Sequence, residues 1–193
     1  MTREKTEPAS PGALLAGEPR AVLARITTGD PLSLRALVAD RAEEHHLLVD
    51  GDAVHLRTLA HCARHALDCP DPLRPASWLA EQVDLVLDRW CAEEGRRGAE
   101  EGPGAPAEPA SGVWVELAGP LGIEPDRARR ACGRFNLLPD GERAAFFALV
   151  LDRRDAQEHA RGAGRSLVQL AREARRALAA LLARRGKGAA DPP

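Results

Sequence analysis

Aromatic residues and long apolar runs are scarce in this chain of 193 residues. It contains no tyrosine, and phenylalanine and tryptophan together make up 3% of the sequence, whereas alanine, leucine and arginine are abundant. This composition favours helical bundles over sheets, because strands are enriched in aromatic and β-branched side chains. No apolar run approaches the roughly 18 residues that a membrane-spanning helix requires. We therefore expect an all-α protein that does not cross a membrane.

Signals for export and for disulfide formation are also missing. The first twelve residues, MTREKTEPASPG, contain no apolar signal core. The four cysteines show neither a CxxC spacing nor a compact disulfide layout. We therefore expect a cytoplasmic protein with reduced thiols.

The sequence has no recognisable catalytic motif. It lacks a phosphate-binding loop and a nucleophile elbow, and the pair Gly162 and Gly164 follows no predicted strand. Its carboxylates are scattered over helix faces, as solvated carboxylates usually are. We expect neither an enzyme nor a bound cofactor.

One segment rich in histidine and cysteine is an alternative site. His61, His65 and Cys69 recur every four residues and so share one face of a predicted helix. Imidazole and thiolate both suit zinc, but the fourth ligand would have to come from the preceding helix, where His45 and His46 lie. A histidine-rich polar face explains the same spacing, so no metal site is predicted.

Charge is distributed unevenly along the chain. The formal net charge is −2, yet from Glu124 onward there are fifteen Lys and Arg against nine Asp and Glu. The basic excess is strongest over residues 153–187, with ten against three. A DNA-facing module needs such an excess, although a solvated helix face rich in arginine would show it too.

Hydrophobic periodicity predicts a series of amphipathic helices. Asp30 is expected to cap a helix that continues towards His46 and ends at Gly51. The expected segments are residues 19–28, 30–46, 52–69, 75–94 and 125–135. The helix at 75–94 is apolar over most of its surface and is therefore expected at the centre of a bundle.

The predicted helices form two small domains. Residues 96–112 are dense in Gly, Pro, Ala and Glu, which is typical of a flexible linker. This places a helical domain at residues 18–95 and a second at 113–186, with disordered ends at 1–17 and 187–193.

The carboxy-terminal stretch from Leu138 to Leu182 reads as three helices with two breaks. The second helix is predicted around residues 156–160, a glycine-containing turn follows, and Ser166 is placed where an N-cap belongs. The last helix is predicted to bury an apolar stripe: Leu167, Leu170, Ala171, Ala174, Leu178, Leu181 and Leu182. A helix, a turn with glycine and a second helix form the helix-turn-helix pattern of DNA-binding proteins.

About a quarter of the chain resembles region four of bacterial RNA polymerase sigma factors of the extracytoplasmic-function type. The residues that carry the resemblance are Leu138, Pro139, Ala160, Gly164, Ser166, Arg176, Ala177, Ala180 and Leu181. They match the pattern of that family without a gap. The segment from Pro75 to Trp90 is similar, more loosely, to region two of the same family, through Trp78, Leu79, Asp88 and Arg89.

The resemblance implies a transcription protein that binds core RNA polymerase and promoter DNA, with an anti-sigma regulator as a further possible partner. The residues implied in DNA binding are Arg165, Ser166, Gln169, Arg172, Arg175 and Arg176. Those implied in polymerase binding are Trp78, Asp84, Asp88 and Arg89.

Alternative functions remain open at this point. The helix at 75–94 carries acidic residues where the family has basic and aromatic ones, which favours a sigma-like interaction protein that does not open promoters. A repressor that binds DNA without polymerase is a further alternative. The predicted hairpin could also serve only to stabilise its domain.

Overall fold

The computed structural model describes residue 30 and residues 32–100 and 112–183. These residues form helices and loops and contain no strand, as the composition predicted. None of the described helices combines the length and the apolar character that crossing a bilayer requires. The helix expected at 19–28, the two expected disordered ends and residues 101–111 of the expected linker lie outside the described residues.

The chain divides into two compact units, which are described separately. The first comprises Met1–Arg41 and Gly51–Leu87, and the second comprises Ala42–Asp50 and Asp88–Pro193. The division falls inside a helix, between residues 87 and 88, whereas the sequence placed it at residues 96–112. Residues 96–100 of the expected linker are the last residues of that helix.

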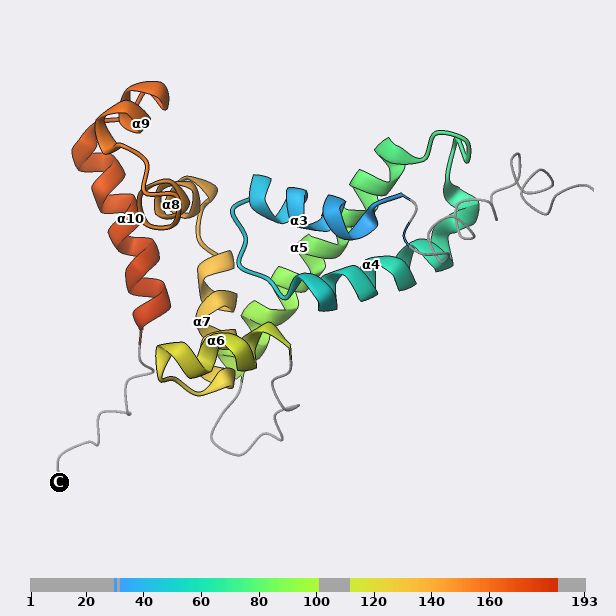
Figure 1. The fold of residues 1–193 in the computed structure, drawn as a ribbon, viewed down its shortest axis with the longest axis horizontal. Coiled ribbons are helices and arrows are strands. Elements are labelled where there is room, and N and C mark those ends of the chain that lie inside the picture. Colours follow the sequence, from blue (N-terminus) through green and yellow to red (C-terminus); the bar gives the residue numbers. More distant parts are fainter. Residues whose placement is uncertain (1–29, 31, 101–111, 184–193) are drawn as a thin grey trace, which may run out of the picture. The chain divides into compact units, whose positions relative to one another are not determined.

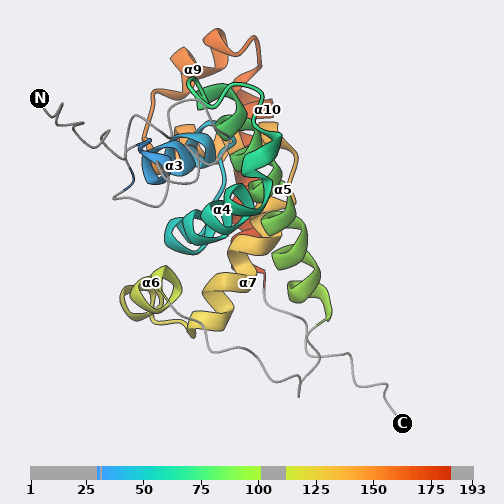
Figure 2. The ribbon, with the colours of Figure 1, turned by 90° about the vertical axis from the view of Figure 1, so that its right-hand side faces the viewer.

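The first unit begins with α3 (Leu34–Glu44), which lies alongside α4 and α5 (Figures 1 and 2). The carboxylate of Asp30 accepts hydrogen bonds from the backbone N–H groups of Leu34 (2.6 Å) and Arg35 (3.1 Å), so its capping role is confirmed. The predicted start directly after Asp30 is wrong, because the helix begins at Leu34. The predicted end at Gly51 is wrong, because Gly51 is the first residue of α4 (Gly51–His65).

The apolar residues of the segment at 52–69 are Val54, Leu56, Leu59, Ala60, Ala63, Ala66 and Leu67, and they are the residues that the sequence predicts to be buried. The buried face of α4 differs from this pattern. It consists of Val54, Thr58, His61 and Cys62, whereas Leu56 is 63% exposed. Polar side chains are accommodated because they find partners: Thr58 Oγ1 donates to the Val54 carbonyl oxygen (2.9 Å), and His61 Nε2 lies 3.0 Å from Gln82 Oε1. A 3₁₀ turn, η1 (Ala66–Asp68), follows.

Helix α5 (Ala76–Glu100) is longer than predicted and contributes to both units. In the first unit it buries Trp78, Leu79, Val83 and Leu87, as its apolar surface predicted. Arg41 of α3 reaches across to it, donating from Nε to Asp84 Oδ1 at 2.8 Å.

The second unit packs the end of α5 closely against α7 (Pro125–Asn136), which follows the short α6 (Val113–Leu121). A Cβ at Gly133 would lie 3.1 Å from the Glu94 carbonyl oxygen, so glycine allows this approach. The Glu94 side chain is 5% exposed and accepts two hydrogen bonds from Arg129, at 2.6 and 2.8 Å. This bidentate pair satisfies a carboxylate that would be costly to bury alone.

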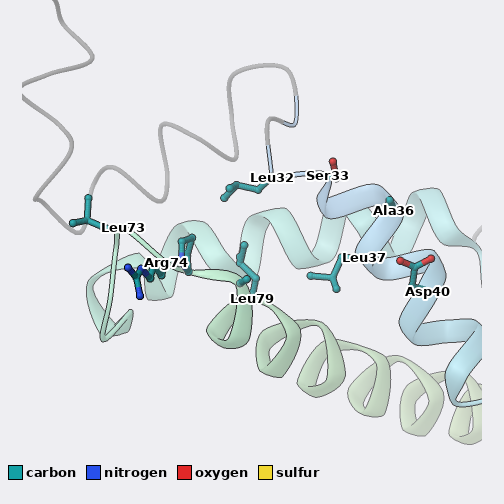
Figure 3. Close-up of a pocket in the computed structure, with 10 residues that line it drawn as sticks. Leu32, Ser33, Ala36, Leu37, Asp40, Leu73, Arg74 and Leu79 are labelled. Atoms are coloured by element: carbon teal, nitrogen blue, oxygen red, sulfur yellow. The ribbon is translucent and has the colours of Figure 1, made fainter.

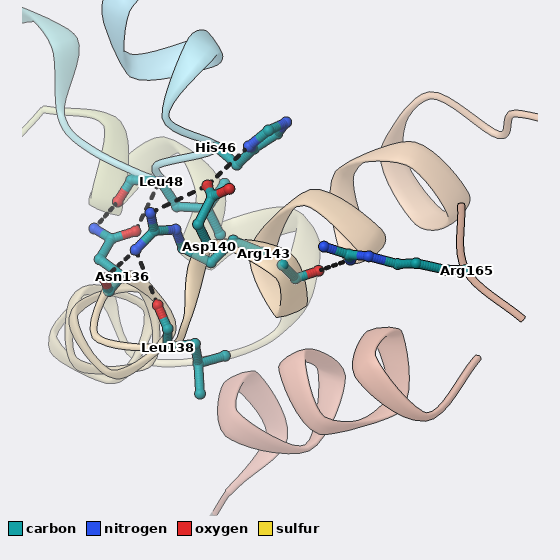
Figure 4. A network of polar contacts seen from close by, with 8 residues as sticks. His46, Leu48, Asn136, Leu138, Asp140, Arg143 and Arg165 are labelled. Atoms are coloured by element: carbon teal, nitrogen blue, oxygen red, sulfur yellow. Dashed lines mark hydrogen bonds and ion pairs between the residues drawn. The ribbon is translucent and has the colours of Figure 1, made fainter. Parts of the chain in front are cut away.

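The segment at residues 42–50 comprises the end of α3 and the connection to α4; it belongs to the second unit and is held there by Asn136 (Figure 4). The buried Asn136 amide accepts from the Leu48 N–H (2.8 Å) and donates to the Leu48 carbonyl oxygen (2.9 Å). Arg143 Nη1 donates to the carbonyl oxygens of Asn136 (2.9 Å) and Leu138 (3.0 Å), which lie at and just beyond the carboxyl end of α7.

The rest of the second unit is α8 (Asp140–Phe146), the π-helical turn η2 (Phe147–Leu151), α9 (Ala156–Gly162) and α10 (Leu167–Leu182). Among its described residues, the core includes these clusters of buried side chains: Ala145, Ala160, Leu170 and Ala174; and Phe135, Phe146 and Ala177. In the sequence, Val150 follows Ala145, Phe146 and Leu149 at helical spacing and is therefore expected on their apolar face. It is 43% exposed instead, because the π-helical turn changes the register.

Candidate nucleic-acid interface

Helices α9 and α10 are both capped by their own sequence. Asp155 Oδ1 accepts from the Glu158 N–H at 2.8 Å, and Ser166 Oγ accepts from the Gln169 N–H at 3.2 Å, so the predicted N-cap at Ser166 is confirmed. Between the two helices Gly164 adopts a φ of 64°, in the left-handed region that favours glycine. The turn is therefore determined by local chemistry.

The packing of α10 decides which of its faces is open. Leu170, Ala174 and Ala177 are buried at i, i+4 and i+7, with α10 packed on α8, α9 and α7. Leu167, Leu178 and Leu182 are 43%, 41% and 64% exposed, so the predicted apolar stripe is too wide.

The carboxyl end of α10 is held by an arginine of α7. Arg134 donates to the carbonyl oxygens of Ala180 (3.2 Å) and Ala183 (3.1 Å). Burial lowers the pKa of Arg134, and the positive charges of Arg130 and Arg127 lower it further. A guanidinium at these carbonyl groups complements the negative end of the helix dipole and fixes the direction of α10.

Arg165 does not project to solvent in the manner that the resemblance implied. Its Nη1 forms an ion pair with Glu173 Oε2 at 2.8 Å and lies 3.4 Å from the Gly141 carbonyl oxygen, so the guanidinium points towards α8 (Figure 4). The side chain is 32% exposed. Arg165 thus joins the turn to α8 and α10 instead of facing outward.

Two further residues of the implied DNA-binding set are also engaged within the protein. Gln169 is exposed, and its Nε2 donates to Glu173 Oε1 at 3.3 Å. Arg176 pairs with Glu142 of α8 at 3.0 Å. Glu173 therefore holds both Arg165 and Gln169 and sets the side-chain arrangement at the start of α10.

Arg172 and Arg175 are the implied residues that remain unpaired. Both are exposed, and neither makes a hydrogen bond or ion pair within the part of the chain that the structure describes. They lie at i+4 and i+7 from Val168, which is 70% exposed, on the face opposite the buried residues of α10. A hollow of about 400 Å³ lies here, lined by Ser166, Val168, Gln169, Arg172, Glu173 and Arg176.

Val168 is the residue of this face that the sequence-based prediction missed. The helical period could have identified Val168. It is two positions from the buried Leu170, so the two side chains point to opposite sides of the helix, and it is four positions from Arg172, so these two share a face. The predicted apolar stripe instead starts at the neighbouring Leu167 and leaves out Val168. We call Val168, Arg172 and Arg175 the outer face of α10.

The residues implied in polymerase binding differ in exposure, and they fall into an engaged pair and an exposed pair. Trp78 is buried at 6% exposure, and Asp84 is bound by Arg41, so neither is available as an unpaired surface group. Asp88 and Arg89 are exposed on α5. Trp90 is buried as well, at 5% exposure.

The histidine and cysteine segment does not assemble as a ligand set. Helix α4 ends at His65, so Cys69 is not on the same helix face. His61 is bound to Gln82, and His65 Nδ1 lies 3.0 Å from Asp68 Oδ2. Among the described residues no group of three or more His, Cys, Asp or Glu could hold a metal ion.

A pocket of about 530 Å³ lies in the first unit (Figure 3). Its lining is mainly apolar, with Leu37 of α3 and Leu79 of α5 among the side chains that face it. Asp40 and Arg74 are the charged residues that line it.

Comparisons with protein-family models, with curated proteins and with solved structures gave no match. Any assignment of function therefore depends on the residues and the geometry of these surfaces.

Proposed function

We propose that this protein is a sigma-factor-like transcription protein that holds promoter DNA with the outer face of α10 and docks on core RNA polymerase. The observation that carries the DNA-binding part is the pair Arg172 and Arg175, exposed and without partners in the described part of the chain. They project from a helix that Ser166 caps and a left-handed Gly164 precedes.

The chemistry of this face fits duplex DNA. A helix that follows a short turn enters the major groove with its first residues at the base edges. Arg172 is in the second turn of α10, and Arg175 lies one turn further along the same face, where phosphates come within reach. The buried Leu170 and Ala174 keep the opposite face against α8 and α9, so the helix presents a rigid basic edge.

The polymerase-binding part of the proposal relies on the resemblance of α5 to region two. Its surface candidates are reduced to Asp88 and Arg89, the exposed members of the implied set. An exposed charged pair suits a protein partner through complementary charge.

A second function is favoured by the burial of Trp78 and Trp90. Opening a promoter requires aromatic side chains on which extruded bases can stack. Both tryptophans of α5 are in the core, and the exposed residues Glu81 and Asp88 are acidic. The second candidate is therefore a sigma-like adaptor that binds polymerase and does not melt DNA.

Co-purification tests the proposal directly. Tagged full-length protein is incubated with bacterial core RNA polymerase and with duplexes that contain a random central sequence, at low salt of about 50 mM. Retained polymerase together with an enriched duplex motif supports the sigma-like function, and retained polymerase without enriched DNA supports the adaptor. If neither polymerase nor DNA is retained, both proposals are wrong.

A pair of variants separates specific from general charge effects. Replacing Arg172 and Arg175 by alanine should reduce the slope of log affinity against log salt by about one, because Arg175 is the member of the pair that reaches a phosphate and each phosphate contact contributes roughly 0.9. The control replaces Arg64 and Arg96, which are exposed and lie on α4 and α5, and removes the same charge. Equal loss in both variants would contradict a role for the outer face.

A further inference from the structure

Val168 occupies the leading position of the outer face of α10. It is the second residue of the helix, directly after Ser166 and Leu167, and 70% of its side chain is exposed. Its β-branched side chain has one strongly preferred rotamer in a helix, so its two methyl groups have a defined direction. This apolar group therefore stands where a recognition helix first meets base edges.

The polar neighbours of Val168 are less free to read bases. Glu173 binds both Arg165 (2.8 Å) and Gln169 (3.3 Å), and the Ser166 hydroxyl caps the helix. Arg172, one turn beyond Val168, has no partner in the described part of the chain. The outward groups on the outer face at this end are thus the two methyl groups of Val168 and the guanidinium of Arg172.

Each of these groups has one preferred base partner in the major groove. Thymine presents the only methyl group there, and guanine presents the two acceptors that an arginine binds in bidentate fashion. Positions 168 and 172 are about 6 Å apart along the helix axis, and stacked bases are about 3.4 Å apart. The two bases are therefore expected within about two base pairs of each other.

We infer that Val168 contacts the methyl group of a thymine and Arg172 reads a guanine within about two base pairs of it, so that together they set the DNA sequence preference of α10. The inference rests on the proposed DNA binding by the outer face. It assigns specificity to a residue that the resemblance did not include, and it removes Arg165 and Gln169 as primary base readers.

Base analogues test this inference one atom group at a time. The full chain first selects a duplex from the random pool, and each thymine of that duplex is then replaced by deoxyuridine, which lacks the methyl group. Fluorescence anisotropy should show one thymine whose replacement weakens binding about three- to fourfold, as expected for one buried methyl group. The Val168→Ala variant should bind the thymine and deoxyuridine duplexes equally.

The guanine contact is tested with a second analogue. Replacing the nearby guanine by 7-deazaguanine should weaken DNA binding by the wild type and should not weaken binding by Arg172→Ala.

The variants are expected to fold, and the experiment distinguishes failure of the base-reading inference from failure of DNA binding. Val168 is exposed and alanine is the better helix former, so Val168→Ala retains the structure. Val115→Ala is the matched control, since Val115 is a 51% exposed valine of α6. A selected duplex that is insensitive to every deoxyuridine, or equally sensitive with Val168→Ala, overturns the inference and leaves DNA binding intact. Failure of the wild type to bind any duplex overturns the proposed function and the inference together.

Discussion

At the scale of single residues, buried polar side chains form the contacts that the apolar pattern of the sequence does not predict. Asn136 is 4% exposed and forms two hydrogen bonds with the backbone of Leu48, a residue 88 positions away in the sequence. An apolar pattern cannot predict such a contact, because the pattern assigns polar residues to the surface. Arg165 shows the same limit, since its partner Glu173 becomes apparent only when the turn is formed.

The first prediction concerns Asn136. Asn136→Ala should lower the free energy of unfolding by about 1 to 2 kcal/mol, because it leaves the part-buried N–H and C=O groups of Leu48 without this partner. Urea denaturation measures this change. Gln169→Ala removes an exposed amide and serves as the control, with an expected change within about 0.5 kcal/mol. Equal stability of Asn136→Ala and the wild type would mean that the segment at 42–50 does not depend on this amide.

At the scale of elements, the helix caps and the glycine turn that the sequence predicts are present in the structure. The predicted buried faces of the helices are not always the ones that the structure buries. Ser166, Gly164 and Asp30 act where the sequence placed them, because a cap depends only on neighbours along the chain. The apolar pattern of α4 pointed to Leu56, yet the buried face centres on Thr58 and His61. Which face is covered depends on Gln82 of α5, and that pairing is tertiary.

The second prediction compares two glycines of the same hairpin. Gly164→Ala forces a side chain into the left-handed region and should cost about 1 kcal/mol of stability and weaken DNA binding by changing the direction of α10. Gly162 is the last residue of α9, and a Cβ there would meet no atom within 4 Å. Gly162→Ala should therefore be neutral or stabilising by about 0.5 kcal/mol. Thermal unfolding measures both variants, and a reversed order would contradict the turn geometry.

At the scale of the whole molecule, the composition leaves few kinds of side chain that change protonation at alkaline pH. The chain has no tyrosine, and its lysines are Lys5 and Lys187, so cysteine dominates side-chain titration around pH 9 to 11. Burial raises the pKa of Cys62, Cys91 and Cys132 from 9.0 to about 11. The unfolded chain therefore loses these protons at lower pH than the folded one.

The third prediction follows from this difference in proton binding. The thiols should leave stability unchanged below about pH 8 and reduce it as the pH rises from 9.0 towards about 11, by roughly 1 kcal/mol per thiol near pH 10. Urea denaturation at about pH 8 and about pH 10 measures the change. The native thiols should also react slowly with Ellman's reagent at about pH 8, whereas unfolded protein should react rapidly. Rapid reaction of all four cysteines in native protein would contradict their burial.

Charge is the second property of the whole molecule that bears on function. The basic excess over residues 153–187 is compatible with a DNA-facing module and with a solvated helix face. In the structure, some of its described arginines have carboxylate partners and others do not. Arg165 and Arg176 are paired with carboxylates of the same unit, while Arg172 and Arg175 are not paired within the described residues. The outer face of α10 therefore contains only two of the ten basic residues that lie in this range of the sequence.

By itself the sequence determined the helical class, the caps at Asp30 and Ser166 and the break at Gly164, because these depend on periodicity and on residues within a few positions. The tertiary structure decided which face each helix buries, that α5 continues to Glu100, and which arginines are left without a carboxylate. These features depend on side chains that are distant along the chain and meet only when the helices pack, so no local pattern contains them.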